Sequence, residues 1–133
     1  QTCKAIDNAA QVTREDGIIV VAASCSEGVG PEEFRTLHSS VRSPQDVLAE
    51  VSRDDVHAEG VSWQNQILAR AQINHRVFLC SNLDDNVARS MMVTPVNSIS
   101  SGLELAFKSL GNNSGLTVIP RGPLVLTTLK ERR

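Results

Sequence analysis

The sequence predicts an α/β domain of three layers, in which a mostly parallel sheet is flanked by helices. Two observations carry this prediction. Six apolar residues follow Gly17 without alternating with polar ones, which is typical of a strand covered on both faces. Further along the chain, apolar runs alternate with stretches of helical spacing, which favours parallel strands joined by right-handed crossovers. The order of the strands in the sheet stays open.

The strand predicted over Gly17–Ala23 leads into a glycine loop. Gly28 and Gly30 stand between this strand and a helix that we expect over residues 31–40, where a proline suits the first turn. Open α/β sheets bind ligands at the carboxyl ends of their strands. We therefore expect any chemistry to gather near Cys25–Gly30.

The two glycines of this loop do not identify a ligand. Their spacing does not complete a dinucleotide fingerprint, because Glu33 stands where a third glycine is needed. A loop that cradles phosphate and a tight turn that needs positive φ both stay open. Glu27 is the carboxylate inside the loop, and it is either a functional acid or a solvated loop residue.

The remaining elements follow from apolar spacing and from capping residues. Further helices are expected over residues 1–12, 43–51, 63–74, 82–89 and 98–110, and further strands over residues 76–81, 91–94 and 116–119. Ser43, Ser62 and Ser98 are the expected N-caps of three helices, and Gly111 is the expected C-cap of the last one. Residues 54–60 are polar and are expected to form a loop.

Apolar stripes indicate which face of each helix is buried. Trp63, Ile67 and Ala71 recur every four residues and form the stripe of the helix over 63–74. Trp63 can pack in the core or donate through its indole N–H, and both roles stay open. The clearest stripe belongs to the last helix and consists of Ile99, Leu103, Ala106, Phe107 and Leu110.

Composition indicates a single domain over residues 1–133 with an aliphatic core. Aromatic residues make up 3% of the chain and tyrosine is absent, so valine, isoleucine, leucine and alanine must fill the interior. The formal net charge of −2 and the lack of a basic run before Lys130 argue against nucleic acid as a partner. No stretch has the length of a membrane span, so no membrane partner is expected.

Cysteine usage favours a reducing compartment. Cys3, Cys25 and Cys80 are odd in number and lack zinc-like spacing, so we expect buried free thiols and a cytoplasmic location. The chain opens with Gln1 rather than methionine, inside an expected helix. We therefore expect an excerpt of a longer protein or a processed chain.

No complete catalytic or metal-binding motif is present. His38, His57 and His75 are widely spaced and form no His-x-x-x-His pair, so no metal site is expected. No Gly-x-Ser-x-Gly elbow supports nucleophilic hydrolysis. Gln1 and Lys4 project from one helical face and offer an amide and a cation, which suit a small carboxylate. Such a pair is also common on ordinary protein surfaces.

Several stretches together resemble one known family. Gln1–Ala5 resembles the end of a Tyr-Gln-x-x-Lys-Ala segment, and Gly17–Gly30 resembles a signature of glycine, apolar strand and Cys-x-Glu-Gly-x-Gly. Three more stretches follow in the expected order: Trp63–Arg70, Thr94–Ser98 and Val118–Pro123. The chain thereby resembles the C-terminal domain of the nickel-pincer-nucleotide-dependent lactate racemase family, over nearly its whole length.

The resemblance implies a racemase or epimerase of small 2-hydroxy acids. In that family a nickel-pincer nucleotide, tethered to a lysine, takes the hydride from C2 of the substrate, and two histidines exchange the hydroxyl proton. The tether, the nickel ligand and these histidines belong to the family's N-terminal domain. The resemblance therefore implies that this chain carries no catalytic residue of its own, is inactive alone, binds no cofactor alone, and pairs with the N-terminal domain of the same protein.

Residue by residue, the resemblance assigns Gln1, Lys4 and Trp63 to the wall of the substrate cleft. Lys4 would balance the substrate carboxylate, while Gln1 and Trp63 would fix its pose. The lead-in to Trp63 is less acidic than expected, which leaves the particular hydroxy acid open. The loop facing the partner domain would be shaped by four residues without a chemical role: Cys25, Glu27, Gly28 and Gly30.

Two other functions compete with this one. The chain could be a stand-alone α/β module that binds a nucleotide or another anion at Cys25–Gly30. It could also be an interaction domain whose loop edge serves only as a docking surface.

Overall fold

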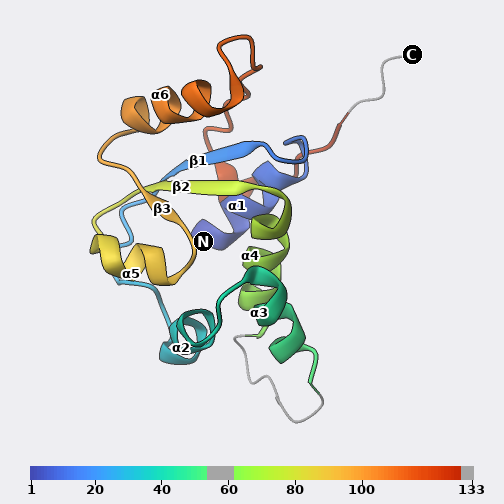
Figure 1. Ribbon diagram of the computed structural model, residues 1–133, viewed down its shortest axis with the longest axis vertical. Helices are drawn as coiled ribbons and strands as arrows, with labels where there is room; N and C mark the ends of the chain where they lie inside the picture. Colours follow the sequence, from blue (N-terminus) through green and yellow to red (C-terminus); the bar gives the residue numbers. More distant parts are fainter. Residues whose placement is uncertain (54–61, 130–133) are drawn as a thin grey trace.

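The computed structural model describes residues 1–53 and 62–129, and its centre is a parallel sheet of three strands (Figure 1). The strands follow the order β1-β2-β3, with bounds Ile18–Ala22, Arg76–Cys80 and Thr94–Pro95. β1 and β2 pair along their whole length, whereas β3 pairs only with Phe78 and Leu79 of β2. The predicted parallel α/β fold is confirmed, and the open question of strand order is answered.

Helices cover both faces of the sheet and complete the three layers. One face carries α6 (Ile99–Leu110). The other face carries α1 (Thr2–Ala10), α2 (Glu32–Ser40), α4 (Ser62–Asn74) and α5 (Asp85–Ser90). α3 (Pro44–Val51) packs against α4, and the short 3₁₀ helix η1 (Gly122–Leu124) packs against α1. None of the described helices is both long and apolar enough to cross a membrane.

Alternating side chains along the strands divide the core in two. Ile19 and Val77 point into the larger core, which they share with α1, α2, α4 and α5. Val20 and Phe78 point the other way, toward α6. There Gly102 lets the helix approach closely, because a Cβ on it would lie 2.9 Å from Val20 Cγ1. β1 is therefore covered on both faces, as its unbroken apolar run predicts.

The predicted helix caps are largely confirmed. Ser43 accepts a backbone N–H of the first turn of α3 at 3.2 Å. Ser98 accepts the Ser101 N–H at 3.0 Å, and the Ser101 hydroxyl accepts the Ser98 N–H at 3.1 Å, which makes a capping box. Gly111, with φ of 92°, follows α6 as its C-cap. Ser62 differs in being the first residue of α4.

The strand predicted over residues 91–94 is wrong in its position. Met91 is the C-cap of α5, and Met92 has φ of 56°, a left-handed conformation that no strand accommodates. β3 begins only at Thr94. The apolar pair of methionines thus ends a helix and does not begin a strand.

The strand predicted over residues 116–119 is absent. No described residue pairs with this stretch in the sheet, and Leu116 and Val118 are 57% and 73% exposed. An apolar, β-branched run becomes a strand only where a neighbouring strand meets its backbone and a layer covers its side chains. Within the described residues this stretch has neither.

In two helices the predicted apolar stripe includes a first residue that is exposed and does not belong to the buried face. Trp63 and Ile99 are 44% and 38% exposed, although Ala71 and Ala106 of the same helices are buried. Trp63 and Ile99 lie in the first turns of α4 and α6, where they reach solvent. The loop predicted over residues 54–60, with His57, lies outside the described residues.

Candidate functional site

The candidate site lies at the carboxyl ends of β1 and β2, where the loops after the two strands run together. The Ala23 N–H donates to the carbonyl of Cys80 at 3.0 Å, and the Asn82 N–H donates to the carbonyl of Ser24 at 3.2 Å. These bonds continue the pairing of the strands beyond the sheet. They hold the glycine loop at the sheet edge where α/β proteins commonly bind ligands.

The glycine loop is a tight turn. The Gly28 N–H donates to the carbonyl of Cys25 at 2.9 Å, and the φ angles of Cys25, Gly28 and Gly30 are 49°, 75° and 102°. A Cβ on Gly28 or Gly30 would have no atom within 4 Å. Glycine is therefore favoured at these positions by the backbone conformation and not by close packing. Of the two interpretations left open, the structure supports the tight turn.

The loop, α2 and α5 border an open hollow of about 430 Å³. Three charged residues line this hollow, and all three are exposed: the acidic residues Glu27 and Glu32 and the basic residue Arg35. Two carboxylates against one guanidinium repel an anion more than they attract it. The stand-alone nucleotide- or anion-binding module therefore finds no support in this hollow.

α1 begins beside the loop and brings two predicted residues with it. Gln1 is the N-cap residue: its carbonyl accepts the Ala5 N–H at 3.1 Å, and its side chain makes no capping hydrogen bond. The Thr2 hydroxyl lies 3.8 Å from Cys25 Sγ, which joins the start of the helix to the loop. Lys4 follows Gln1 by about one helical turn.

Lys4 and Trp63 come together in space. Lys4 Nζ lies 5.6 Å from the centroid of the Trp63 ring, within the range of a cation–π contact. α1 and α4, which carry the two residues, pack against each other. The exposure of Trp63 excludes a core role for its ring. The structure thus gathers Lys4 and Trp63 close to Gln1, at the end of α1 that meets the glycine loop.

Two residues at this site were not predicted. Thr2 reaches Cys25, and Arg35 lines the hollow beside the loop. Both are placed by the packing of α1 and α2 against the sheet edge. The sequence signal for Thr2 was its position between Gln1 and Lys4, and nothing in the local pattern marked Arg35.

His38 occupies a structural position. The side chain is fully buried, and its Nδ1 lies 2.7 Å from Asn65 Oδ1. Its ring also packs on Phe34, with 5.3 Å between the ring centroids. Burial lowers the pKa of His38, against the smaller opposing effect of the hydrogen bond that the ring makes with Asn65 Oδ1. This histidine belongs to the core and is not available to a ligand.

His75, the other histidine among the described residues, offers no metal site either. The ring nitrogens of His75 lie 2.9 Å and 3.1 Å from the carbonyl oxygens of Ala71 and Thr13. His57 falls outside the described residues. Within residues 1–53 and 62–129, no three His, Cys, Asp or Glu side chains cluster in a way that could hold a metal ion.

The three cysteines are free, as predicted, but they are half-buried and not fully buried. Burial raises the pKa of the Cys3 thiol, which favours the neutral form over the thiolate. Cys3 packs against the larger core from α1, which gives this residue a structural role.

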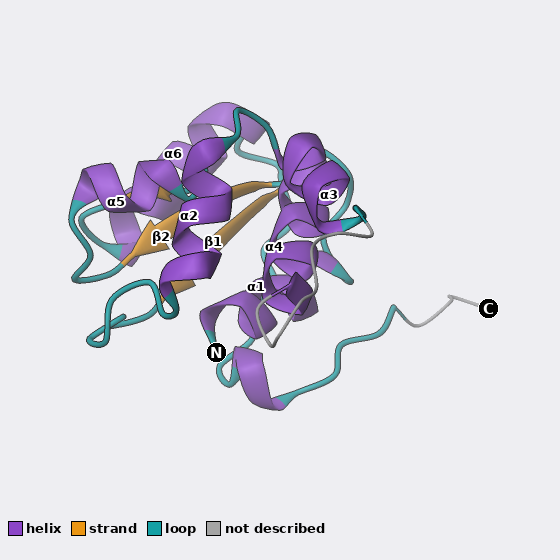
Figure 2. Cartoon of the chain, turned by 90° about the horizontal axis from the view of Figure 1, so that it is seen from below, coloured by secondary structure: helices purple, strands orange, loops and turns teal. Residues whose placement is uncertain are grey.

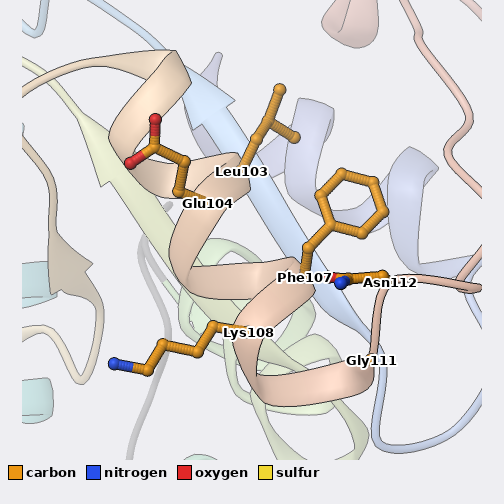
Figure 3. A pocket seen from close by; sticks show the side chains of 6 residues that line it. All are labelled: Leu103, Glu104, Phe107, Lys108, Gly111 and Asn112. Carbon is orange, nitrogen blue, oxygen red and sulfur yellow. The ribbon is translucent and has the colours of Figure 1, made fainter.

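A larger hollow lies away from all predicted site residues. It measures about 750 Å³ and is formed by one face of α6 and the residues after it (Figure 3). Leu103 and Phe107 project to one side of the helix, and Glu104 and Lys108 project to the other. Because α6 covers the opposite face of the sheet from α1 and α4, this hollow cannot share a ligand with Lys4 and Trp63.

Comparison with known proteins identifies close relatives. The family model described as "Lactate racemase C-terminal domain" matches residues 1–127. Lactate racemase of Thermoanaerobacterium thermosaccharolyticum is 30% identical over 134 residues, which cover 98% of this chain and 31% of that protein. Lactate racemase of Lactiplantibacillus plantarum is 27% identical over 124 residues, or 92% of this chain and 29% of that protein.

A solved structure shows the same arrangement of elements. The lactate racemase apoprotein from Thermoanaerobacterium thermosaccharolyticum superposes with a TM-score of 0.87 at 28% identity. The superposition covers 96% of this chain and 31% of that chain. The chain therefore spans less than a third of the length of the relatives that it matches.

Proposed function

The chain belongs to the lactate racemase C-terminal domain family, and we propose that it forms one wall of the active-site cleft in a racemase or epimerase of small 2-hydroxy acids. The observation that carries this proposal is the contact of the Lys4 ammonium with the Trp63 ring, one turn from Gln1. A cation, an indole and an amide at one exposed place suit a small molecule with a carboxylate and a hydroxyl group.

Each of the three side chains has a distinct part in this proposal. The Lys4 ammonium neutralises the substrate carboxylate, and the Trp63 ring keeps that ammonium in place through its negative face. The Gln1 side chain, which does not cap its helix, is free to donate to or accept from the substrate. Together they bind and orient the substrate, whereas the groups that transfer the hydride and the proton would belong to the N-terminal domain.

The described residues do not provide a nickel site. His38 is enclosed in the core, both ring nitrogens of His75 face backbone carbonyls, and no other described cluster could hold a metal. The nickel-pincer nucleotide, which supplies hydride acceptance and return at C2, would be held by the N-terminal domain of the same protein.

A racemisation assay tests the proposal. The complete protein is produced with nickel and the enzymes that make the nickel-pincer nucleotide, and single enantiomers of several 2-hydroxy acids are supplied. We expect interconversion of at least one pair of enantiomers, because the domain is proposed to orient such acids. Failure to interconvert any of them, with no nickel nucleotide bound to the protein, would contradict the proposal.

A further inference from the structure

We infer that the segment 116–129, which follows α6, is the surface on which the N-terminal domain of the proposed racemase docks. Among the described residues, ten large apolar side chains are exposed, and six of them belong to this one segment. They are Leu116, Val118, Leu124, Val125, Leu126 and Leu129, with exposed fractions from 38% to 85%. Such a concentration of exposed apolar side chains is typical of an interface.

The segment is seated on α1 and is not a loose end. The Asn8 side-chain N–H donates to the carbonyl of Gly122 at 2.7 Å, and the Thr127 hydroxyl donates to the carbonyl of Asn8. Gly122 also lies against the helix, because a Cβ on it would be 2.8 Å from Ala5 Cβ. The backbone therefore has a defined course, while the neighbouring leucines remain exposed.

The docking surface is continuous with the candidate site. α1 carries Gln1 and Lys4 at its start and contacts η1 through Ala5 and Asn8. η1 lies beside α1 (Figures 1 and 2), and beyond η1 the chain still contacts this helix at Thr127, whose hydroxyl donates to the carbonyl of Asn8. A partner that covers residues 116–129 consequently lies next to α1, and its surface can form the second wall of the proposed cleft beside Lys4 and Trp63.

The lengths of the relatives indicate which partner this is. The chain spans 31% of one lactate racemase and 29% of another. More than two thirds of each of these proteins therefore has no counterpart in this chain. That portion needs a contact surface on this domain. The inference rests on the proposed function, because the N-terminal domain is the partner that a shared cleft requires.

Cysteine labelling of the complete protein tests this inference. Leu126→Cys is compared with a matched control, Leu105→Cys, which replaces a leucine that is 48% exposed on α6. Leu126 is 85% exposed, so its replacement removes little packing within this domain. Each variant reacts with a maleimide at a concentration where the protein is monomeric, and mass spectrometry separates the label from that on Cys3, Cys25 and Cys80.

The expected result is labelling at Leu126→Cys that is at least about ten-fold slower than at Leu105→Cys, as for a side chain in an interface core. Equal rates would overturn the inference. Slow labelling that appears only when the protein dimerises would also overturn it, because the occupant would then be a second copy. The readout does not depend on turnover, so a protein without racemase activity but with a protected Leu126→Cys would contradict only the proposed activity.

Discussion

Single residues decide how charge is presented at the candidate site. Lys4 and Trp63 come from distant parts of the sequence and meet where α1 packs on α4. The ammonium stays near solvent, where an incoming carboxylate can reach it, and the ring restricts its position. Helical spacing predicts that Gln1 and Lys4 share a face. It cannot predict the meeting with Trp63, which depends on the packing of two helices.

Trp63 variants separate the role of the ring from that of the indole N–H. Trp63→Phe keeps an aromatic face for Lys4, and Trp63→Ala removes it. In the complete enzyme we expect kcat/KM to fall in both variants, and about 2- to 5-fold further in Trp63→Ala, the size of an exposed cation–π contact. Equal kcat/KM values for the two variants would show that the ring does not position Lys4.

His38 makes the stability of the domain depend on pH. Burial lowers the pKa of His38 in the folded chain below the ordinary histidine value of 6.5, so the unfolded chain binds the proton more readily. The stabilisation of the folded chain that comes from keeping His38 neutral is fully present above the pKa that this side chain has in the unfolded chain. It is lost as the pH falls through that value toward the lower folded pKa.

Thermal unfolding of the wild type and of His38→Gln measures this dependence. We expect the wild type to lose more stability than the variant between about pH 7.5 and pH 5, since the variant has no proton to bind at this position. The variant is less stable overall, because the ring that packs on Phe34 is lost. If the difference in stability between the wild type and His38→Gln stays constant over this pH range, His38 is not the source of the pH dependence.

At the level of elements, prediction succeeded where a local signal sufficed. The β1 and β2 strands follow from unbroken apolar runs, and the serines at the starts of α3 and α6 follow from capping chemistry. The stretch over 116–119 has the composition of a strand but lacks a paired neighbour among the described residues. Pairing is a property of the assembled sheet, so composition alone could not exclude it.

Gly17 sets the entry into β1. A Cβ on Gly17 would lie 2.4 Å from Thr13 Cγ2 and 2.7 Å from the carbonyl oxygen of Arg14, whose position is fixed by the Gly17 N–H at 3.0 Å. We expect Gly17→Ala to reduce the free energy of unfolding by about 1–3 kcal/mol through overpacking. Gly115→Ala is the matched control, since its Cβ would meet no atom within 4 Å.

Denaturant unfolding of both glycine variants checks this prediction. Gly115→Ala should stay within about 0.5 kcal/mol of the wild type, as for a surface substitution without strain. If Gly17→Ala is as stable as Gly115→Ala, the turn before β1 must adjust freely, and the close approach has no energetic consequence.

At the level of the whole molecule, the chain corresponds to less than a third of the length of its lactate racemase relatives. The starts of α1 and α4 present Gln1, Lys4 and Trp63 as exposed residues, and the exposed apolar segment is bound to α1. The fold class was predictable because layers follow from patterns of burial. The exposed segment was not, because exposure is decided by tertiary packing.

We propose that Lys4 binds the carboxylate of the substrate, and the kinetics of Lys4→Ala in the complete, nickel-loaded enzyme give a direct test of this role. Lys108→Ala, on α6 across the sheet, removes the same charge without touching the site. We predict that Lys4→Ala lowers kcat/KM about 10- to 100-fold, the value of a charge-assisted hydrogen bond, while Lys108→Ala leaves it unchanged. Equal kcat/KM values for Lys4→Ala and the wild type would show that Lys4 does not bind the substrate carboxylate.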